Sequence, residues 1–252
     1  MNIAIVLYGQ PRDFLKGYEN INNIIKNNIN CKFDFFYHCW TLNENEIYNH
    51  SPWRNNDKNT LIYNSDIDIK LKNLYNPIMY EYENQSNIVI NKSIYENSIA
   101  YNNTSDICKK NVNNTLFQLY SRNKARNLLN KYLNEINNLN YYDFVLFVRF
   151  DLFFIPIIKF NELNKINIYI AKEHYPRKLI ADNCIVMSTK IFLEWFNIYE
   201  ELNNILNNNE LSIKINNLNE HCAINPEELL FAKYIYHYNN TNNILFYNYI
   251  KV

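Results

Sequence analysis

Glycine is nearly absent from this sequence, in which Gly9 and Gly17 are the only two among 252 residues. The Walker loop and the GxGxxG dinucleotide turn both need several glycines, because the backbone must approach a phosphate closely. This scarcity disfavours P-loop kinases and nicotinamide-dependent oxidoreductases. It also disfavours nucleotidyltransferases, whose first loop is rich in glycine and basic residues.

Paired cysteines and an excess of charge are absent as well. The five cysteines are odd in number and show no CxxC spacing, which argues against a zinc cluster and against a complete disulfide framework. Lysine plus arginine and aspartate plus glutamate each total 25, so the net charge is +0 and no overall field attracts a nucleic-acid backbone. We expect reduced thiols and no nucleic-acid partner.

The sequence also shows no targeting or membrane segment. The first apolar run has no basic region before it and no small-residue cleavage site after it, and it ends at Gln10-Pro11-Arg12. The longest apolar stretch, Tyr142 to Ile158, carries three charged residues that a membrane helix would not accept. We therefore predict a cytoplasmic protein without a membrane span, located in the host cytoplasm if the gene is viral.

Apolar residues, by contrast, are plentiful. Hydrophobic residues make up 48% of the chain and aromatic residues 16%, which is enough material for a large core. No linker rich in proline, glycine or serine divides the sequence. We predict one domain over residues 1–252.

The hydrophobic periodicity predicts strands and helices that alternate in the first half and a mixed arrangement in the second. The predicted strands are Ile3 to Tyr8, Phe33 to Trp40, Ile78 to Glu83, Phe144 to Phe150, Ile166 to Ala171, Asn183 to Met187 and Ile244 to Ile250. The predicted helices are Phe14 to Ile29, Leu116 to Ile136, Lys190 to Leu206 and Pro226 to Tyr238, with residues 41 to 76 mostly loop. This order indicates an open α/β sheet with helices on both faces, which binds ligands at the carboxyl ends of its strands.

One charged pair stands at the end of the most apolar strand. Arg149 and Asp151 follow the run from Phe144 to Val148, and their spacing of two points both side chains the same way. One interpretation is an ion pair that closes the strand end, since buried charges persist when they are paired. The other interpretation is a ligand site in the crevice at the strand ends.

Four sequence blocks carry a resemblance to a known class of enzymes. They are Leu7-Tyr8-Gly9-Gln10-Pro11-Arg12, residues 34 to 40 (DFFYHCW), residues 118 to 125 (QLYSRNKA) and Arg149-Phe150-Asp151. The run from Tyr142 to Asp151 resembles the strand and DxD motif of GT-A glycosyltransferases. The four blocks together resemble glycosyltransferase-like proteins of large DNA viruses and polysaccharide loci. The resemblance implies a GT-A-like (Rossmann-like) fold, with a donor-binding half over 1–155 and an acceptor-side half over 156–252.

The resemblance also implies the members of the site. The residues on the donor side would be Tyr8, Gly9, Gln10, Arg12, His38, Trp40, Lys124 and Arg149, with Asp151 as a ligand of Mn²⁺ or Mg²⁺. In GT-A enzymes two aspartates hold the ion that bridges the donor diphosphate, and here Arg149 stands where the first is expected. Asp151 could still offer the ion one carboxylate, or the Arg149 guanidinium could contact the diphosphate directly.

Several of these residues also have ordinary structural interpretations. Arg12 could be a surface residue after a turn, His38 a buried hydrogen-bonding group, and Trp40 part of the core. Lys124 could face the solvent on its helix. For an inverting reaction the base that takes the acceptor proton would be Asp182, Glu227 or Glu228, although the two glutamates also suit a first helical turn.

We therefore predict a glycosyltransferase that moves a sugar from a nucleotide-sugar donor to a glycan or glycoprotein acceptor. The alternative is a glycan- or nucleotide-binding module that kept the sheet and lost the chemistry. The missing first aspartate motivates this alternative.

Overall fold

The computed structural model describes residues 1–41, 66–102, 109, 112–171, 183–210, 229–230, 233, 244–247 and 249–251. Its strands are β1 (Asn2–Gly9), β2 (Lys32–Thr41), β3 (Met79–Asn84), β4 (Phe144–Arg149), β5 (Phe154–Pro156), β6 (Ile168–Ala171), β7 (Cys184–Ser188), β8 (Ile244–Tyr247) and β9 (Tyr249–Lys251). Its α-helices are α1 (Phe14–Lys26), α2 (Ile67–Tyr75), α3 (Ser93–Glu96), α4 (Ile99–Asn102), α6 (Val112–Glu135), α7 (Thr189–Trp195) and α8 (Ile198–Leu206). Two short 3₁₀ helices, η1 (Gln85–Asn87) and η2 (Phe160–Glu162), complete the described elements.

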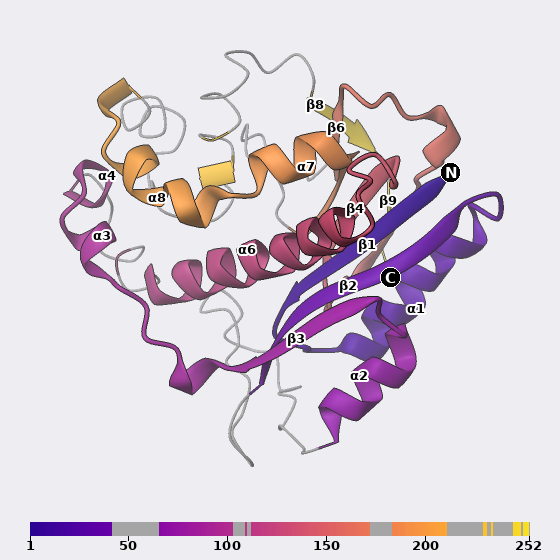
Figure 1. Cartoon of the computed structure of the whole chain (residues 1–252), viewed down its shortest axis with the longest axis horizontal. Coiled ribbons are helices and arrows are strands. Elements are labelled where there is room, and N and C mark those ends of the chain that lie inside the picture. Colours follow the sequence, from indigo (N-terminus) through magenta and orange to yellow (C-terminus); the bar gives the residue numbers. More distant parts are fainter. Residues whose placement is uncertain are drawn as a thin grey trace.

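Seven strands form one mixed sheet in the order β3-β2-β1-β4-β7-β6-β8, and β5 pairs with β9 in a separate ribbon. The strands β1, β2, β3 and β4 run parallel to one another, whereas β7 runs antiparallel to both β4 and β6. The predicted open, mixed α/β sheet is confirmed. Figure 1 shows α6 crossing one face of this sheet, with α1 and α2 on the other.

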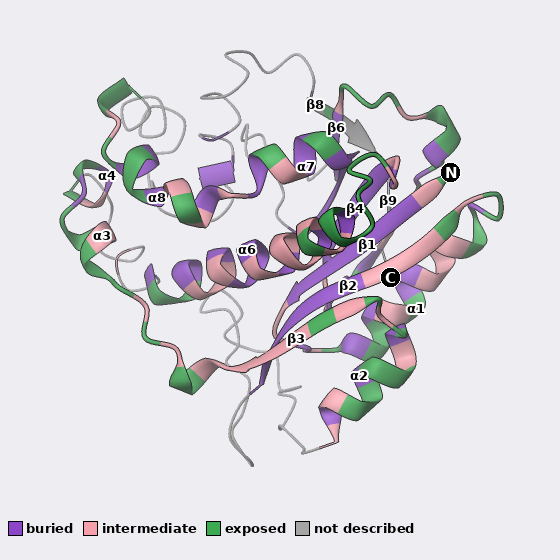
Figure 2. Cartoon of the chain, in the orientation of Figure 1, coloured by how far each residue is buried: buried purple, intermediate pink, exposed green. Residues whose placement is uncertain are grey.

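The central strands are buried on both faces, as continuous apolar runs predict for parallel strands between helices. In β1 the side chains of Ala4, Val6 and Tyr8 join the core beneath α6, whereas Ile3, Ile5 and Leu7 join the core beneath α1 and α2. Figure 2 shows the resulting buried band along β1 and β4. The ends of these strands therefore have fixed positions between two packed helical layers.

Most predicted elements in the first half are confirmed, with small shifts in their ends. The helix predicted from Phe14 to Ile29 ends at Lys26. Helix α2 lies within residues 41–76, where a long loop with short helical pieces was predicted. The short strand β5 and both 3₁₀ helices were not predicted, because three residues are too few to show a period.

Two predictions in the second half are wrong. The helix predicted from Lys190 to Leu206 is two helices that meet at Phe196 and Asn197. The break lets Trp195 and Ile198, on either side of it, both join the core beneath α6. The strand predicted from Ile244 to Ile250 is also two, because β8 pairs with β6 while β9 pairs with β5. The predicted helix from Pro226 to Tyr238 lies mostly outside the described residues.

In the part of the chain that the structure describes, no helix combines the length and the apolar character needed to cross a membrane. The division into a donor-binding half and an acceptor-side half stays a prediction.

Candidate functional site

The order of the strands marks one place in the sheet where a ligand is expected. From β1 the chain moves outward through β2 to β3, and it then returns to place β4 on the opposite side of β1. Open α/β sheets bind ligands at such a switch point, outside the carboxyl ends of the strands, because the connections there diverge and leave a crevice. Here the crevice is expected between the turns after β1 and β4, where Tyr8 pairs in register with Arg149.

The turn after β1 begins at Gly9, whose φ of 98° lies in the left-handed region that favours glycine. The Gly9 N–H donates to Ser121 Oγ on α6 at 2.8 Å, and Gln10 Nε2 donates to Gln85 Oε1 at 2.8 Å. Side chains from two other elements thus hold this turn. Gly9, Gln10 and Arg12 are all partly exposed there.

Ser121 is also the first member of a buried hydrogen-bond chain. His38 Nδ1 lies 2.7 Å from Ser121 Oγ, and His38 Nε2 lies 2.8 Å from Glu83 Oε2. A carboxylate only accepts hydrogen bonds, so the His38 ring carries its proton on Nε2 and the Ser121 hydroxyl donates to Nδ1. Burial lowers the pKa of His38 and outweighs the contacts with Glu83, which raise it. The net shift favours the neutral ring.

Glu83 on β3 lies at the other end of this hydrogen-bond chain and has several partners. Besides His38, Tyr120 Oη donates to Glu83 Oε1 at 3.1 Å, and Lys124 Nζ lies 3.3 Å from the same oxygen and 2.9 Å from Glu81 Oε1. The hydrogen bond from His38 is the largest cause that lowers the pKa of Glu83 to about 2. Burial lowers the pKa of Lys124, but its contacts with Glu81 and Glu83 outweigh burial and raise it.

The turn after β4 is held in a different way, by backbone contacts with α1. A Cβ atom added at Gly17 would lie 1.7 Å from the Phe150 carbonyl oxygen, so only glycine allows the helix to approach this closely. The buried Asn20 Nδ2 donates to the Leu152 carbonyl at 2.7 Å. On the β7 side, the Arg149 N–H donates to the Asn183 carbonyl at 3.1 Å.

Within this turn, Arg149 and Asp151 form a two-point ion pair. Arg149 Nε donates to Asp151 Oδ1 at 2.8 Å, and Nη2 donates to Oδ2 at 2.6 Å. The Arg149 side chain is 27% exposed and the Asp151 side chain 12%. The ion pair expected by one of the two interpretations is therefore present at the edge where the other places a ligand site.

A second arginine lies inside the core next to the first turn. Arg122 on α6 is buried, stands over the Tyr8 ring at 4.9 Å and donates from Nη2 to Tyr8 Oη at 3.1 Å. The Tyr8 ring also has an apolar neighbour, because it stacks on the Phe147 ring with 4.5 Å between the centroids. Tyr8 thus connects α6 to the strand pair at the switch point.

The structure brings together the predicted residues of the donor side, but at different depths. Tyr8, His38 and Trp40 are buried, whereas Lys124 and Arg149 remain partly exposed. Trp40 lies on the same face as His38, as their alternation predicts, and its ring stacks on Tyr120 at 5.4 Å. The roles of these residues in donor binding stay predictions.

The predicted base candidates are not among the described residues: Asp182, Glu227 and Glu228 all lie outside them. Asn183 is described, and its buried Oδ1 has no hydrogen-bond partner in the structure as described. It immediately precedes β7, and its carbonyl accepts the hydrogen bond from the Arg149 N–H at the same edge of the sheet.

Sequence reasoning missed three residues that hold the site: Gly17, Asn20 and Glu83. Ser121 and Arg122 belong to the block of residues 118 to 125, but their contacts with the first turn, His38 and Tyr8 were not predicted. Only Gly17 carried a usable signal, because a glycine inside a helical pattern in a chain with two glycines indicates close packing. The others look like ordinary polar residues until the fold places their partners.

The contacts of Asp151 bear on whether this carboxylate can bind a divalent cation. Both oxygens of this carboxylate already accept hydrogen bonds from Arg149, and the guanidinium charge lies where a cation would bind. No group of three or more His, Cys, Asp and Glu side chains among the described residues could hold a metal. In this arrangement the pair does not fit Mn²⁺ or Mg²⁺, and the predicted metal stays a prediction.

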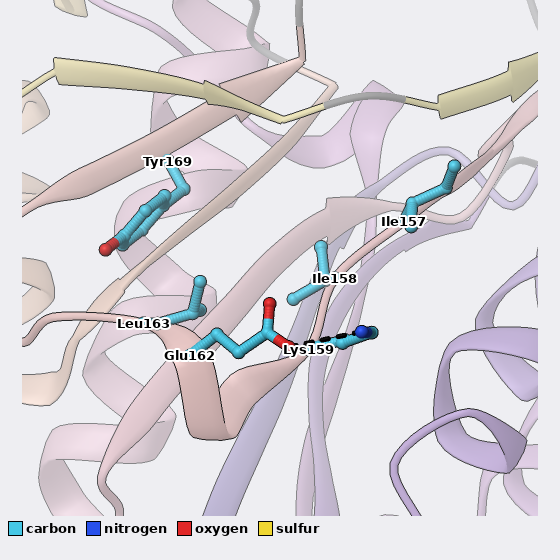
Figure 3. A pocket seen from close by; sticks show the side chains of 6 residues that line it. All are labelled: Ile157, Ile158, Lys159, Glu162, Leu163 and Tyr169. Carbon is cyan, nitrogen blue, oxygen red and sulfur yellow. Dashed lines mark hydrogen bonds and ion pairs between the residues drawn. The ribbon is translucent and has the colours of Figure 1, made fainter.

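A pocket of about 260 Å³ lies elsewhere, lined by Ile157, Ile158, Lys159, Glu162, Leu163 and Tyr169. Figure 3 shows these side chains, with Lys159 and Glu162 in an ion pair of 3.1 Å. Asn28, which precedes β2, bonds to the backbone of Ile158 and Phe160. This contact places the pocket toward the amino ends of the strands, away from the switch point.

The strand order defines a class: an α/β domain with an open mixed sheet. No protein-family profile and no curated protein matches the chain. Among solved structures, mouse xyloside xylosyltransferase 1 in its apo form is similar over 97% of this chain and 83% of its own, with 7% identity and a TM-score of 0.42. At this distance the likeness carries no conclusion about the reaction, and the narrower resemblance to viral and polysaccharide-locus proteins stays a prediction.

Proposed function

We propose that this chain is a glycosyltransferase that binds a nucleotide-sugar donor at the switch point between β1 and β4. The sugar passes to a glycan or glycoprotein acceptor. In the transfer, the bond between the anomeric carbon and the donor phosphate oxygen breaks, a bond to an acceptor oxygen forms, and a nucleoside diphosphate leaves.

One observation carries the proposal: the four sequence blocks of the resemblance converge at one edge of the sheet. Gly9 from the first block bonds to Ser121 from the third, and Ser121 bonds to His38 from the second. Tyr8 from the first block pairs in register with Arg149 from the fourth. Blocks more than a hundred residues apart thus meet where open α/β sheets bind ligands.

The charges at this edge suit an anionic leaving group. Arg149 ends β4, and Arg12 lies in the turn that begins at Gly9, so both guanidinium groups belong to the two turns that border the crevice. A guanidinium forms charge-assisted, often two-point hydrogen bonds to phosphate oxygens. We assign to these groups the stabilisation of the charge that develops on the diphosphate as it leaves.

An inverting transfer also needs a base that takes the proton of the acceptor hydroxyl. We keep Asp182, Glu227 and Glu228 as the candidates, since the acceptor-side half supplies them. A retaining transfer would need no such separate base, so the stereochemistry of the product is the measurement that decides whether one is required.

A binding module without turnover is the second candidate function. The engaged carboxylate of Asp151 favours it, because the pair with Arg149 leaves the family's usual metal-binding arrangement absent here.

A thermal-shift panel of nucleoside diphosphates and nucleotide sugars, followed by an assay of donor hydrolysis, tests both functions. Stabilisation by one nucleotide together with hydrolysis of its sugar conjugate supports the transferase. Stabilisation without hydrolysis supports the nucleotide-binding module. No stabilisation by any nucleotide rejects the transferase and that module, and leaves only a module that binds glycans. Gln10→Ala and Arg12→Ala should weaken the stabilising interaction, whereas Leu15→Ala, at an exposed position of α1, serves as the matched control.

A further inference from the structure

The Arg149–Asp151 pair has the geometry of a fixed cationic group. A guanidinium and a carboxylate that share two parallel hydrogen bonds, here 2.8 and 2.6 Å long, are held coplanar and resist rotation. Asp151 is the more buried partner, with 12% of its side chain exposed against 27% for Arg149. The carboxylate therefore anchors the pair, and the Arg149 side chain is the more accessible of the two.

The backbone on either side of the pair is also fixed. Arg149 bonds to β7 through Asn183, and the Phe150 carbonyl lies against Gly17 of α1. The Leu152 carbonyl accepts the buried hydrogen bond from Asn20. The guanidinium is thus positioned before any ligand arrives, which is the condition under which a charge stabilises an anion most effectively.

The sum of charges agrees with a site that needs no metal. Two carboxylates with one divalent cation sum to zero, and one guanidinium with one carboxylate also sum to zero. A divalent cation added to Arg149 and Asp151 would raise the local charge to +2 and would lie beside the guanidinium, where like charges repel. It would also have to displace two charge-assisted hydrogen bonds from the only carboxylate of the pair.

We propose that the Arg149 guanidinium, anchored by Asp151, takes the place of a divalent cation, so that nucleoside diphosphates bind without metal. This inference rests on the proposed function, because it concerns the same diphosphate. Asp151 is then a positioning residue, and Arg149 is the group that contacts the phosphate oxygens.

Isothermal titration with UDP, GDP, CDP and ADP, each in EDTA and again in Mn²⁺, tests the inference on the full chain. We expect the diphosphate that binds best to have the same Kd in both buffers, within about twofold. Binding that appears only with Mn²⁺ would overturn this inference and leave the proposed function standing. Binding in neither buffer would overturn both.

Arg149→Asp provides the sharper arm, because it restores two carboxylates separated by one residue. This variant should lose diphosphate binding in EDTA and regain it in Mn²⁺, so metal dependence would appear where the wild type has none. Arg149→Lys keeps the charge but loses the fork geometry, and it should bind in EDTA with roughly tenfold weaker affinity. If Arg149→Lys and Arg149→Asp both bound the diphosphate in EDTA as tightly as the wild type, the assignment of Arg149 would be rejected.

Asp151→Asn separates the two models without altering the size of the side chain. If Asp151 only positions Arg149, the variant retains metal-free binding with reduced affinity. If Asp151 is the metal ligand, the variant loses a binding that was metal-dependent in the wild type. Thermal unfolding of every variant without ligand shows whether each is folded, and Arg149→Lys remains informative if Arg149→Asp is not.

Discussion

The two turns that border the proposed crevice are held by opposite means. The first turn, at Gly9, is held from α6 by a chain of side-chain hydrogen bonds through Ser121, His38 and Glu83. The second turn, at Phe150, is held from α1 by close contact of backbones and by one buried amide. One face of the sheet uses polar chemistry, and the other uses steric fit.

The difference predicts different responses to perturbation. A hydrogen-bond chain weakens in steps when one member is removed, and it responds to pH because a histidine is part of it. A backbone contact without free space does not weaken in steps, since even a single added methyl group meets a neighbour that must move. The four predictions below test this contrast, from the largest expected effect to the smallest.

Gly17→Ala should have the largest effect. The added Cβ would lie 1.7 Å from the Phe150 oxygen and 2.9 Å from its carbonyl carbon, and both are backbone atoms. We expect the free energy of unfolding to fall by about 3 kcal/mol, in spite of the better helix propensity of alanine. Urea denaturation measures it, with Leu15→Ala on the same helix as the control. A variant as stable as wild type would show that α1 does not hold the second turn.

Asn20→Ala should come next. It removes the amide that donates to the Leu152 carbonyl and leaves that buried oxygen without this partner. The expected loss is about 2 kcal/mol, the cost of an unsatisfied buried group. Glu19→Ala, one residue away and exposed to solvent, should change the stability little. Equal effects of the two substitutions would argue that the amide contributes nothing specific.

Ser121→Ala should cost less, about 1 kcal/mol, because the Gly9 N–H is only part-buried and water can replace the lost acceptor. The variant removes the acceptor of the Gly9 N–H and the donor to His38 Nδ1. Hydrogen exchange of the Gly9 amide should become faster, while exchange within α1 should stay the same. If the Gly9 amide remained equally protected, the chain from α6 would not be what holds the first turn.

The smallest effect should be a dependence of stability on pH. Burial lowers the pKa of His38 in the folded protein below its ordinary value of 6.5, so the unfolded chain binds the proton more readily. The contribution of the neutral ring is therefore fully present above pH 6.5 and declines as the pH falls below it. One group limits the slope to about 1.4 kcal/mol per pH unit.

Urea denaturation measures this slope between about pH 7.5 and 5.5, which is roughly one unit on either side of the ordinary histidine pKa of 6.5. His38→Gln, which keeps a hydrogen-bonding side chain without the titration, should show a flatter profile than wild type. Glu83 does not contribute to the slope between about pH 7.5 and 5.5. Its pKa is lowered from 4.5 to about 2, so its stabilising effect is lost only in more acidic solution. Parallel profiles of wild type and His38→Gln would assign the pH dependence to other groups.

Much of the sheet was predictable because its strands are continuous apolar runs. Ile3 to Tyr8 and Phe144 to Val148 have no other low-energy placement than between two covering layers. The break at Asn197 and the division between β8 and β9 were not predictable, because each depends on which neighbour offers a surface. Periodicity continues smoothly through both places in the sequence.

The positions of the candidate residues were predictable to a similar degree, whereas their roles stay predictions. Strand ends with Gly9, Arg12, Arg149 and Asp151 stood out because charge and glycine are unusual after long apolar runs. The partners of these residues did not stand out. Ser121 and Glu83 are common polar residues, and only the crossing of α6 over β2 and β3 brings them to His38.

By itself the sequence determined the class of fold, the edge at which a ligand is expected and the residues most suited to phosphate. Those features depend on the local pattern of apolar and charged side chains, which the chain carries wherever it folds. Tertiary structure alone decided that Asp151 is engaged by Arg149, that Gly17 is a contact with Phe150 and that burial lowers the pKa of His38. The physical reason is that each of these depends on a partner's distance and on burial, which come from packing rather than from neighbours in sequence.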